Sequence, residues 1–334
     1  MLTRPTDLDD ADLRRTLKRQ WGITAAGIEY LPVGFGSYHW SVFNAEGEHW
    51  FVTVDDLEEK AGFAGESPES VLARLRAALT TARKIYRSGR DFVVAPIPAA
   101  NGAVVNRLCD RFGVAVYPYI DGRSHPWGEY ESRSDRRVVL QILANLHSSP
   151  ETILESALRD DFGLPHRDEL QLALTDLQQV WTGGPYAERA RTLLSSHARE
   201  VEKLLTRYDQ AAERAGQAPE RMVLTHGEPH LANTMRTASG WRLIDWDTTL
   251  IAPPERDIWF LAGDRSILNE YETITGRAVL SDMLDFYRLK WDLTEIAIYI
   301  SLFRRPHAET ADMRESWENL SHYLDPQRWG TSAK

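Results

Sequence analysis

The sequence predicts an α+β protein in which a small β-rich part precedes a larger, mainly helical part. In the first third of the chain, runs of aromatic and β-branched residues are separated by turn residues, a pattern typical of antiparallel strands. Beyond residue 122, apolar residues recur at helical spacing over long segments. Strands followed by helices, rather than alternating with them, indicate an α+β arrangement. With 334 residues, the chain is long enough for one large domain or two closely associated lobes.

The β-rich part begins with a short amphipathic helix. Leu13, Leu17 and Trp21 lie about one turn apart and predict a helix over 10–21. Three strand-like runs then follow, at 28–31, 40–43 and 49–54. A second helix begins at Ser67-Pro68-Glu69, because a capping serine, a first-turn proline and an acid near the positive end of the helix dipole follow one another.

Two more strands are predicted at 92–96 and 112–117, with the hairpin signal Asn101-Gly102 between them. The segment 117–122 reads as a linker to the helical part. Helical spacing of apolar residues predicts four helices beyond it, at 136–147, 170–181, 189–212 and 281–303. We therefore expect an N-terminal lobe of residues 1–118 and a C-terminal lobe of residues 119–334.

The bulk composition excludes several classes of protein. A formal net charge of −10 argues against nonspecific nucleic-acid binding and is compatible with a cationic substrate, although many proteins are acidic simply for solubility. The single cysteine, Cys109, rules out an internal disulfide and a zinc site built from several thiolates. The chain shows no signal-peptide core and no run of about 20 apolar residues. We expect a cytoplasmic monomer or homodimer that contacts neither nucleic acid nor membrane.

Chemistry-bearing side chains concentrate between Val223 and Asp257, after two short apolar runs at 222–225 and 241–244. We expect these runs to pair as a hairpin. Such a hairpin would bring five polar residues together at one end, namely Glu228, His230, Asn233, Asp245 and Asp247. The alternative reading is a polar hairpin with solvated carboxylates.

This set of side chains suits phosphoryl transfer. Magnesium prefers oxygen ligands, one or two from the protein and the rest from phosphate and water, and Asn233 and Asp245 offer such oxygens. Glu228 is placed to accept or orient the proton of an attacking hydroxyl. Phosphoryl transfer depends on positioning and charge neutralisation more than on a strong base.

The motifs His226-Gly227-Glu228-Pro229-His230-Leu231-Ala232-Asn233, Ile244-Asp245-Trp246-Asp247 and Pro253-Pro254-Glu255-Arg256-Asp257 resemble the aminoglycoside phosphotransferase family. The pattern is most similar to the spectinomycin-phosphotransferase branch. The resemblance implies a two-lobe protein-kinase-like fold. Gly34-Phe35-Gly36-Ser37 stands where the family has its phosphate-covering loop, and 117–120 stands at its inter-lobe hinge.

The resemblance also implies roles for individual residues. Glu228 stands at the catalytic-base position, Asn233 and Asp245 stand at the Mg²⁺ positions, and His226 and Asp257 would support the loop. The nucleotide, ATP or GTP, would be bound by Gly34, Gly36, Ser37, Thr53, Tyr117, Tyr119 and Ile120. The substrate would be bound by His230, Asp247, Trp291, Asp292 and Glu295.

Two of these assignments leave alternatives open. His230 suits a structural hydrogen bond as well as contact with phosphate or substrate. Asp292 and Glu295, three residues apart, share one helix face that is either solvated or directed at a cationic substrate.

The sequence departs from the family pattern at two positions. Glu228 stands where aspartate is usual, which moves the carboxylate outward by one methylene. Thr53 occupies the strand position that normally presents a lysine to the nucleotide phosphates. Either Lys60 returns to the site, or an arginine of the following helix, Arg74 or Arg76, compensates. Glu69 would normally pair with the missing lysine, so its partner is open as well.

Together these observations predict a nucleotide- and magnesium-dependent O-phosphotransferase. Its acceptor would be a hydroxyl of a small-molecule antibiotic, such as an aminoglycoside, an aminocyclitol or a nucleoside antibiotic, and phosphorylation would confer resistance. One alternative is a kinase for a metabolite such as a choline-like, homoserine-like or sugar substrate. The other is a catalytically impaired kinase-like binding protein, which Thr53 and Glu228 would favour.

Overall fold

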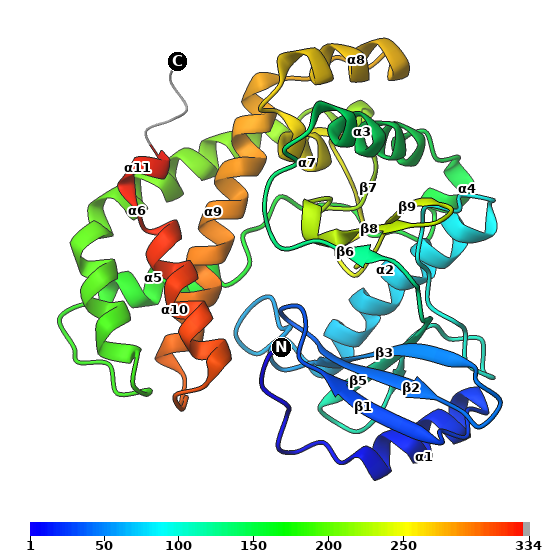
Figure 1. Ribbon diagram of the computed structural model, residues 1–334. Coiled ribbons are helices and arrows are strands. Elements are labelled where there is room, and N and C mark those ends of the chain that lie inside the picture. The colour runs from blue at the N-terminus through cyan, green and yellow to red at the C-terminus, as the bar shows by residue number, and fades with distance from the viewer. Residues whose placement is uncertain (330–334) are drawn as a thin grey trace. The chain divides into compact units, whose positions relative to one another are not determined.

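The computed structural model describes residues 1–329 and confirms the α+β class, with an antiparallel sheet followed by a mainly helical region (Figure 1). The chain forms two compact units. The first contains Met1–Lys60, Ser67–Asp160 and Glu220–Leu280, and the second contains Ala61–Glu66, Asp161–Pro219 and the chain from Ser281 onward. The lobes predicted on either side of residue 118 stay a prediction, because these units reflect compactness and not nucleotide or substrate binding.

A five-stranded antiparallel sheet forms the N-terminal part of the first unit. Its spatial order is β1 (Gly27–Leu31), β2 (Tyr38–Phe43), β3 (His49–Asp56), β5 (Phe112–Pro118) and β4 (Asn106–Arg107). The predicted strands at 28–31, 40–43, 49–54 and 112–117 are all present, each extended by one or two residues. Register places Trp40 opposite Val52 and Val52 opposite Val116, so these apolar side chains share one face.

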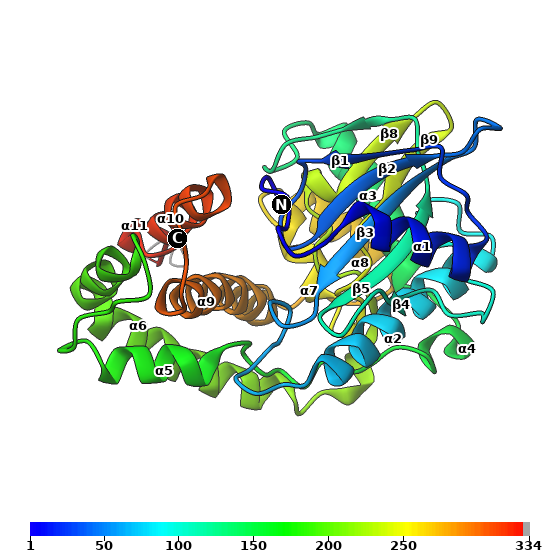
Figure 2. The same ribbon diagram turned by 90° about the horizontal axis from the view of Figure 1, so that it is seen from below.

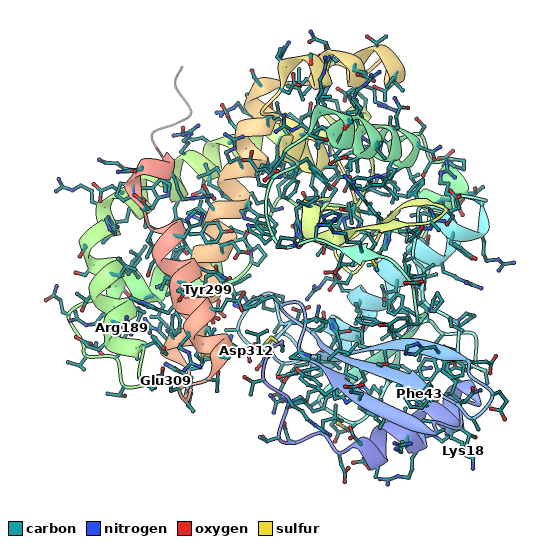
Figure 3. The ribbon with its side chains drawn as sticks, in the orientation of Figure 1. Lys18, Phe43, Arg189, Tyr299, Glu309 and Asp312 are labelled. Atoms are coloured by element: carbon teal, nitrogen blue, oxygen red, sulfur yellow. The ribbon has the colours of Figure 1, made fainter. Side chains whose placement is uncertain are left out.

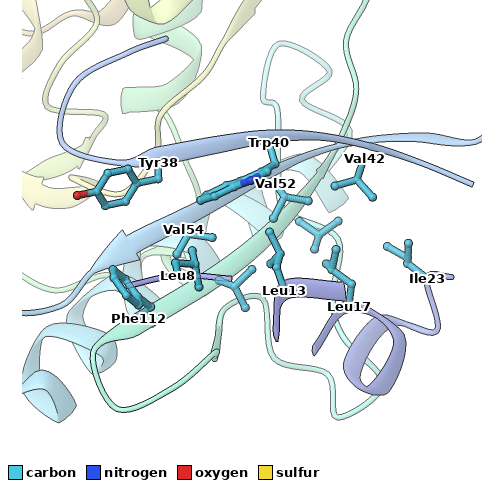
Figure 4. Packing of buried hydrophobic residues seen from close by; sticks show 12 residues of the cluster. Leu8, Leu13, Leu17, Ile23, Tyr38, Trp40, Val42, Val52, Val54 and Phe112 are labelled. Carbon is cyan, nitrogen blue, oxygen red and sulfur yellow. The ribbon is translucent and has the colours of Figure 1, made fainter. Parts of the chain in front are cut away.

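The predicted helix 10–21 is α1 (Asp10–Trp21), and it covers this apolar face (Figures 2 and 4). Leu13 and Leu17 of α1 are fully buried against Trp40 and Val54 of the sheet. The opposite face carries a different set of side chains. Thr53 is in register with His39 and Ala115, and Asp55 follows Thr53 on the same side because side chains alternate along a strand.

The second predicted helix is α2 (Pro68–Arg87), and Ser67 caps it by accepting from the Ser70 backbone N–H. The strand predicted at 92–96 is wrong. Val93 makes one isolated bridge to Leu243, and the Val94 and Ile97 backbone N–H groups donate to two different elements, at Leu243 and Val116. Pro96 and Pro98 interrupt this stretch, and proline has no N–H for a regular ladder. The chain does turn at Asn101-Gly102, where the Gly102 N–H donates to the Ala99 carbonyl, but without a strand at 92–96 the predicted hairpin is not formed.

The remainder of the first unit surrounds the polar segment around residues 226–247. Its helices are α3 (Arg133–His147), α4 (Glu151–Leu154), α7 (Glu255–Ile258) and α8 (Arg265–Thr275). Its short strands are β6 (Arg123–Ser124), β7 (Val223–Thr225), β8 (Thr234–Thr237), β9 (Gly240–Leu243) and β10 (Leu250–Ala252).

The predicted hairpin between 222–225 and 241–244 is wrong. Instead, β9 pairs with β8 across the Ser239-Gly240 turn, and β7 pairs with β10. The hydrogen bonds of β7 go to β10 because the chain returns antiparallel to it after Asp247. The two strand ends nevertheless meet, through hydrogen bonds described below.

The second unit is helical in the part of the chain that the structure describes. It consists of α5 (Arg167–Thr175), α6 (Ala187–Ala215), α9 (Ser281–Arg304), α10 (Ala311–Tyr323) and α11 (Pro326–Trp329). Helix α9 packs against α5, α6 and α10; Figure 3 marks three of these helices by Arg189 on α6, Tyr299 on α9 and Asp312 on α10. The helix predicted at 170–181 ends early, at Thr175. No helix within residues 1–329 has the length and apolar character needed to cross a membrane.

Candidate active site

The loop at 226–233 follows β7 and ends in the 3₁₀ turn η2 (Leu231–Asn233). Asp257 of α7 binds the backbone at the start of this loop. The Asp257 carboxylate accepts hydrogen bonds from the His226 and Gly227 backbone N–H groups, at 2.9 and 2.7 Å. It also accepts from His147 Nε2 at 3.1 Å, and it is fully buried. Although burial opposes its ionisation, the hydrogen bond from His147 lowers the pKa of Asp257 below its usual value. This buried carboxylate fixes the start of the loop.

A histidine and a tyrosine extend this support into the core. His147 ends α3, and its Nδ1 lies 2.7 Å from the hydroxyl of Tyr271 on α8. His147 Nε2 donates to Asp257, and in the neutral ring Nδ1 then accepts from the tyrosine; both side chains are buried. The loop is therefore connected through three buried side chains to three helices, α7, α3 and α8.

His226 links the two halves of the site. Its Nε2 donates to the Ile244 carbonyl at 2.9 Å, and its Nδ1 accepts from the Glu228 backbone N–H at 3.2 Å. These partners match the neutral ring protonated on Nε2. Burial lowers the pKa of His226 to about 4, which also favours the neutral form. The indole of Trp246 packs edge-on against this ring.

Gly227 occupies a position that a side chain would obstruct. Its φ is +105°, and a Cβ built there would lie 2.4 Å from the Arg256 guanidinium. Arg256 cannot easily yield, because it donates to the Thr225 hydroxyl and the Thr248 carbonyl, both at 2.8 Å. Glycine is therefore required for the loop to pass this arginine.

Asn233 and Asp245 lie next to each other because the Ile244 backbone N–H donates to the Asn233 carbonyl at 2.9 Å. The amide nitrogen of Asn233 donates to the Glu228 carbonyl at 3.0 Å, which leaves the amide oxygen available as an acceptor or a metal ligand. Asp245 adopts a left-handed backbone with φ of +64°, which asparagine and aspartate tolerate better than other side chains. Within residues 1–329, no cluster of three His, Cys, Asp or Glu side chains is arranged to hold a metal.

This donor set fits a magnesium ion that takes one or two ligands from the protein and the rest from phosphate and water. The local charge also suits a bound cation. The three carboxylates of Asp55, Asp245 and Asp247 interact electrostatically with one ammonium, that of Lys60. The Asp245 side chain is exposed to solvent, although many protein atoms lie around it. The loss of hydration that these atoms cause, together with the charge of Asp247, raises the pKa of Asp245 well above its usual value. A bound cation would reverse that direction.

Glu228 is half-buried and lies in the same loop as Asn233. One of its carboxylate oxygens is 3.7 Å from His230 Nε2. His230 is buried, lies 3.2 Å from the Asn233 amide nitrogen and contacts the rings of Trp127 and Phe260. His230 is thus in contact with both the predicted base and a predicted metal ligand.

The predicted phosphate loop connects to these residues through Asp55. Gly34 and Gly36 both have positive φ, at +72° and +80°, and the buried Ser37 hydroxyl donates to Asp55 Oδ1 at 2.6 Å. Lys60 Nζ lies 3.2 Å from that same oxygen and 2.5 Å from Asp247 Oδ2. Although burial disfavours the charge of Lys60, Asp247 and Asp55 raise its pKa well above the usual value. Thr53 faces the same side of the sheet as Asp55.

The predicted hinge follows the end of β5. Tyr117 is in register with Phe51 of β3, and burial together with the charge of Asp55 raises its pKa. The Tyr119 backbone N–H donates to the His49 carbonyl at 3.2 Å, and its ring stacks on His49. Ile120 follows directly and is half-buried. The N–H of residue 119 is therefore already bonded within the protein.

The other predicted substrate residues belong to the second unit and are described within it. Asp292 is buried on α9, where Arg328 of α11 donates to it at 2.8 Å. The Trp291 indole donates to the Tyr323 hydroxyl at 3.0 Å. Glu295 is half-buried one turn along α9 from Asp292. Their part in substrate binding stays a prediction.

Sequence reasoning missed several residues of the first unit that contact the predicted site. Asp55, Arg256, His147 and Tyr271 were not among the predicted site residues. Asp55 lies two residues after the predicted Thr53, and Arg256 directly precedes the predicted Asp257. Their closeness to these residues in the sequence could have identified them. His147 and Tyr271 lie far from the motifs in sequence, and nothing in their own neighbourhoods marks them.

Comparison with known proteins identifies the family. Residues 42–299, more than half of the chain, match the phosphotransferase enzyme family. Protein StrN of Streptomyces griseus is 31% identical over 314 residues, which cover 90% of this chain and 88% of StrN.

Two solved structures share the fold. Spectinomycin phosphotransferase APH(9)-Ia, in complex with ADP and spectinomycin, has a TM-score of 0.70 at 16% identity and covers 96% of both chains. Aminoglycoside 2'-phosphotransferase-IIIa, in its GDP complex, has a TM-score of 0.56 at 13% identity, over 97% of this chain and all of that one. These likenesses show the kinase-like fold. The family match covers the segment 226–257 and residues 53–60 of the candidate site, while Gly34, Gly36 and Ser37 precede the matched range. The chain belongs to the phosphotransferase enzyme family.

Proposed function

We propose that this protein transfers a phosphoryl group from ATP or GTP to a hydroxyl of a small-molecule antibiotic, in a reaction that requires Mg²⁺. The observation that carries the proposal is the pairing of Asn233 with the Asp245 segment, through the hydrogen bond between the Asn233 carbonyl and the Ile244 N–H. This bond joins the backbones of the two segments that carry the Asn233 amide and the Asp245 carboxylate, and Glu228 lies in the same loop as Asn233. Such a set suits a metal-bound phosphate and a nearby hydroxyl.

The residues would divide the work as follows. Asn233 and Asp245 would hold Mg²⁺, which supplies charge neutralisation for the transferring phosphoryl group. Glu228 would orient the acceptor hydroxyl and accept its proton. Glu228 directly follows Gly227, whose backbone N–H donates to the buried Asp257 carboxylate. A loop fixed in this way keeps the carboxylate at a defined position, and phosphoryl transfer depends on such positioning.

An antibiotic acceptor is supported by the family and by the likeness to enzymes named for spectinomycin and aminoglycosides. A net charge of −10 would favour a cationic acceptor of that kind through long-range attraction. Phosphorylation would add bulk and negative charge to the antibiotic, and loss of target binding would then confer resistance.

The proposal is tested by a nucleotide-consumption screen with both ATP and GTP. The acceptors are a panel of hydroxylated antibiotics and a panel of choline-like, homoserine-like and sugar-alcohol metabolites. Consumption that depends on an antibiotic and is abolished in Asp245→Asn supports the proposal, with Glu220→Gln, an exposed residue outside the site, as the matched control. Consumption only with a metabolite identifies a metabolite kinase. Nucleotide binding without consumption across both panels identifies a catalytically impaired binding protein.

A further inference from the structure

The turn after β3 returns the chain to the polar face of the sheet. Asp56 begins this turn, because its carboxylate accepts from the Glu58 and Glu59 backbone N–H groups, at 3.0 and 3.3 Å. Its carbonyl accepts from the Lys60 N–H at 3.0 Å, which closes one helical turn. Arg74 of α2 then donates to the Lys60 carbonyl at 3.0 Å. The backbone of Lys60 is thus fixed from two sides.

The Lys60 side chain extends from this turn into the candidate site. Its ammonium lies between Asp55 on the strand and Asp247 on the segment after β9, at 3.2 and 2.5 Å. The side chain is 20% exposed. An ammonium has three N–H donors, so two carboxylate contacts leave a third donor for another anion. Since Asp55 also accepts from Ser37 beside Gly36, this third donor is close to the predicted phosphate loop.

The two arginines of α2 that could replace the strand lysine differ from Lys60 in their surroundings. Arg74 supports the Lys60 backbone, and Arg76 is exposed on α2. Glu69, the acid expected to pair with a strand lysine, instead binds Arg107 at 2.5 Å and is 75% exposed. The acid beside the site cation is therefore Asp55, two residues beyond Thr53 on the same face of β3.

We propose that Lys60 contacts the phosphate groups of the bound nucleotide in place of a strand lysine, and that Asp55 is the positioning residue that orients it. This inference rests on the proposed function, because it requires a nucleotide substrate. The chemistry suits the task, since an ammonium forms strong charge-assisted hydrogen bonds with phosphate oxygens. The long, flexible stem of lysine allows the charge to arrive from a turn as well as from a strand.

The test measures nucleotide affinity by isothermal titration calorimetry, with ATP and with GTP, each in the presence and absence of Mg²⁺. Lys60→Met removes the charge and keeps most of the length of the side chain. A hydrogen bond to a charged group suggests a loss of affinity of about 10- to 100-fold. Lys84→Met on the exposed side of α2 is the matched control and should bind like the wild type.

A second variant separates phosphate contact from a merely structural role. Thr53→Lys combined with Lys60→Met moves the charge back to the strand, on the same face as Asp55. We expect this double variant to recover most of the lost nucleotide affinity. If Lys60 only neutralised Asp55 and Asp247, Lys60→Met would lower the melting temperature without changing nucleotide affinity, and this result would overturn the inference.

The case in which Lys60→Met fails to fold is covered by Asp55→Asn/Lys60→Met, which removes one charge of each sign and lowers the cost of leaving a buried carboxylate unpaired. Affinity within twofold of the wild type in this folded double variant would also contradict the inference. A wild-type protein that binds neither ATP nor GTP would contradict the proposed function itself, and the role of Lys60 with it. Nucleotide binding by the wild type, unchanged in the Lys60 variants, would contradict the role of Lys60 alone.

Discussion

The loop that carries Glu228 and the turn that carries Lys60 contribute to the same site, but they are held in different ways. The backbone of the Glu228 loop is bonded to a fully buried carboxylate, Asp257, which is itself bonded to His147 in the core. The Lys60 turn depends on a side-chain cap from Asp56 and on one arginine contact, and its ammonium reaches the site on a flexible stem.

This difference separates two kinds of functional position. A carboxylate or amide on a short side chain must be placed by its backbone, so its place in the sequence is fixed by the loop that carries it. A lysine has four methylenes, so its charge can arrive at one point in space from more than one position in the chain. The motif at 226–247 therefore resembles the family pattern at the predicted positions other than Glu228, while threonine stands at position 53 where a lysine was expected and the nearby ammonium belongs to Lys60.

The largest loss of activity is expected from substitutions of Glu228, in the loop that Asp257 supports. Glu228→Gln keeps the size of the side chain and removes the proton acceptor, so kcat should fall by about 10²- to 10⁴-fold with the fold intact. Glu228→Asp retracts the carboxylate by one methylene and should cost about 10²-fold if the loop is fitted to glutamate. Initial rates with saturating nucleotide check both. Activity of Glu228→Asp above that of the wild type would show that the loop is not fitted to the longer side chain.

The support of the loop is tested by Asp257→Ala. This change leaves two buried backbone N–H groups and His147 without their acceptor, so the free energy of unfolding should fall by about 3–5 kcal/mol. Urea denaturation followed by tryptophan fluorescence measures the change, and Asp110→Ala at an exposed position is the control. A loss below about 1 kcal/mol would show that the loop does not depend on this carboxylate.

Gly227→Ala tests the same loop with a smaller change. The added methyl group would meet the Arg256 guanidinium, and the positive φ strains any residue with a Cβ, so a loss of about 1–3 kcal/mol is expected. Gly47→Ala, where φ is also positive but the space is open, controls for backbone strain alone. Equal losses in the two variants would mean that Arg256 yields and that only strain matters.

The smallest predicted effect is a pH dependence of stability due to His226. Its pKa is about 4 in the folded protein and about 6.5 when unfolded, so the unfolded chain binds the proton more tightly. The contribution is complete above about pH 6.5 and is lost as the pH falls toward 4, at no more than about 1.4 kcal/mol per pH unit. Urea midpoints between pH 8 and pH 5 should therefore decline more gently in His226→Gln than in the wild type. Parallel declines would assign the pH dependence to other groups.

Much of the fold was predictable because its signals are local. The helix capped by Ser67 and the alternating strands 40–43 and 49–54 carry their own signatures in sequence. The strand pairings of the catalytic segment were not predictable, because β7 has only three residues and its partner is chosen by the packing around it. Segment 92–96 has strand-like composition, but its backbone makes only one isolated bridge, between Val93 and Leu243, and forms no ladder.

The candidate site divides in the same way. Glu228, Asn233 and Asp245 could be named because one short segment contains them. The contact of Lys60 with Asp247 joins residues 187 positions apart. It depends on a turn that Asp56 caps, and the sequence of residues 55–60 does not by itself reveal the geometry of that turn. The ion pair of Asp292 with Arg328 joins residues 36 positions apart, and it gives this acid a structural partner that helix spacing alone could not indicate.

Mass spectrometry of the acceptor is the most direct test of phosphoryl transfer to an antibiotic. The purified protein is incubated with Mg²⁺, with ATP or GTP, and with each hydroxylated antibiotic, and the acceptor is then weighed. We predict an acceptor heavier by one phosphoryl group with the wild type, and no such species with Asp245→Asn or after chelation of Mg²⁺ by EDTA. An unmodified acceptor in every reaction of a wild-type protein that binds nucleotide would contradict the account.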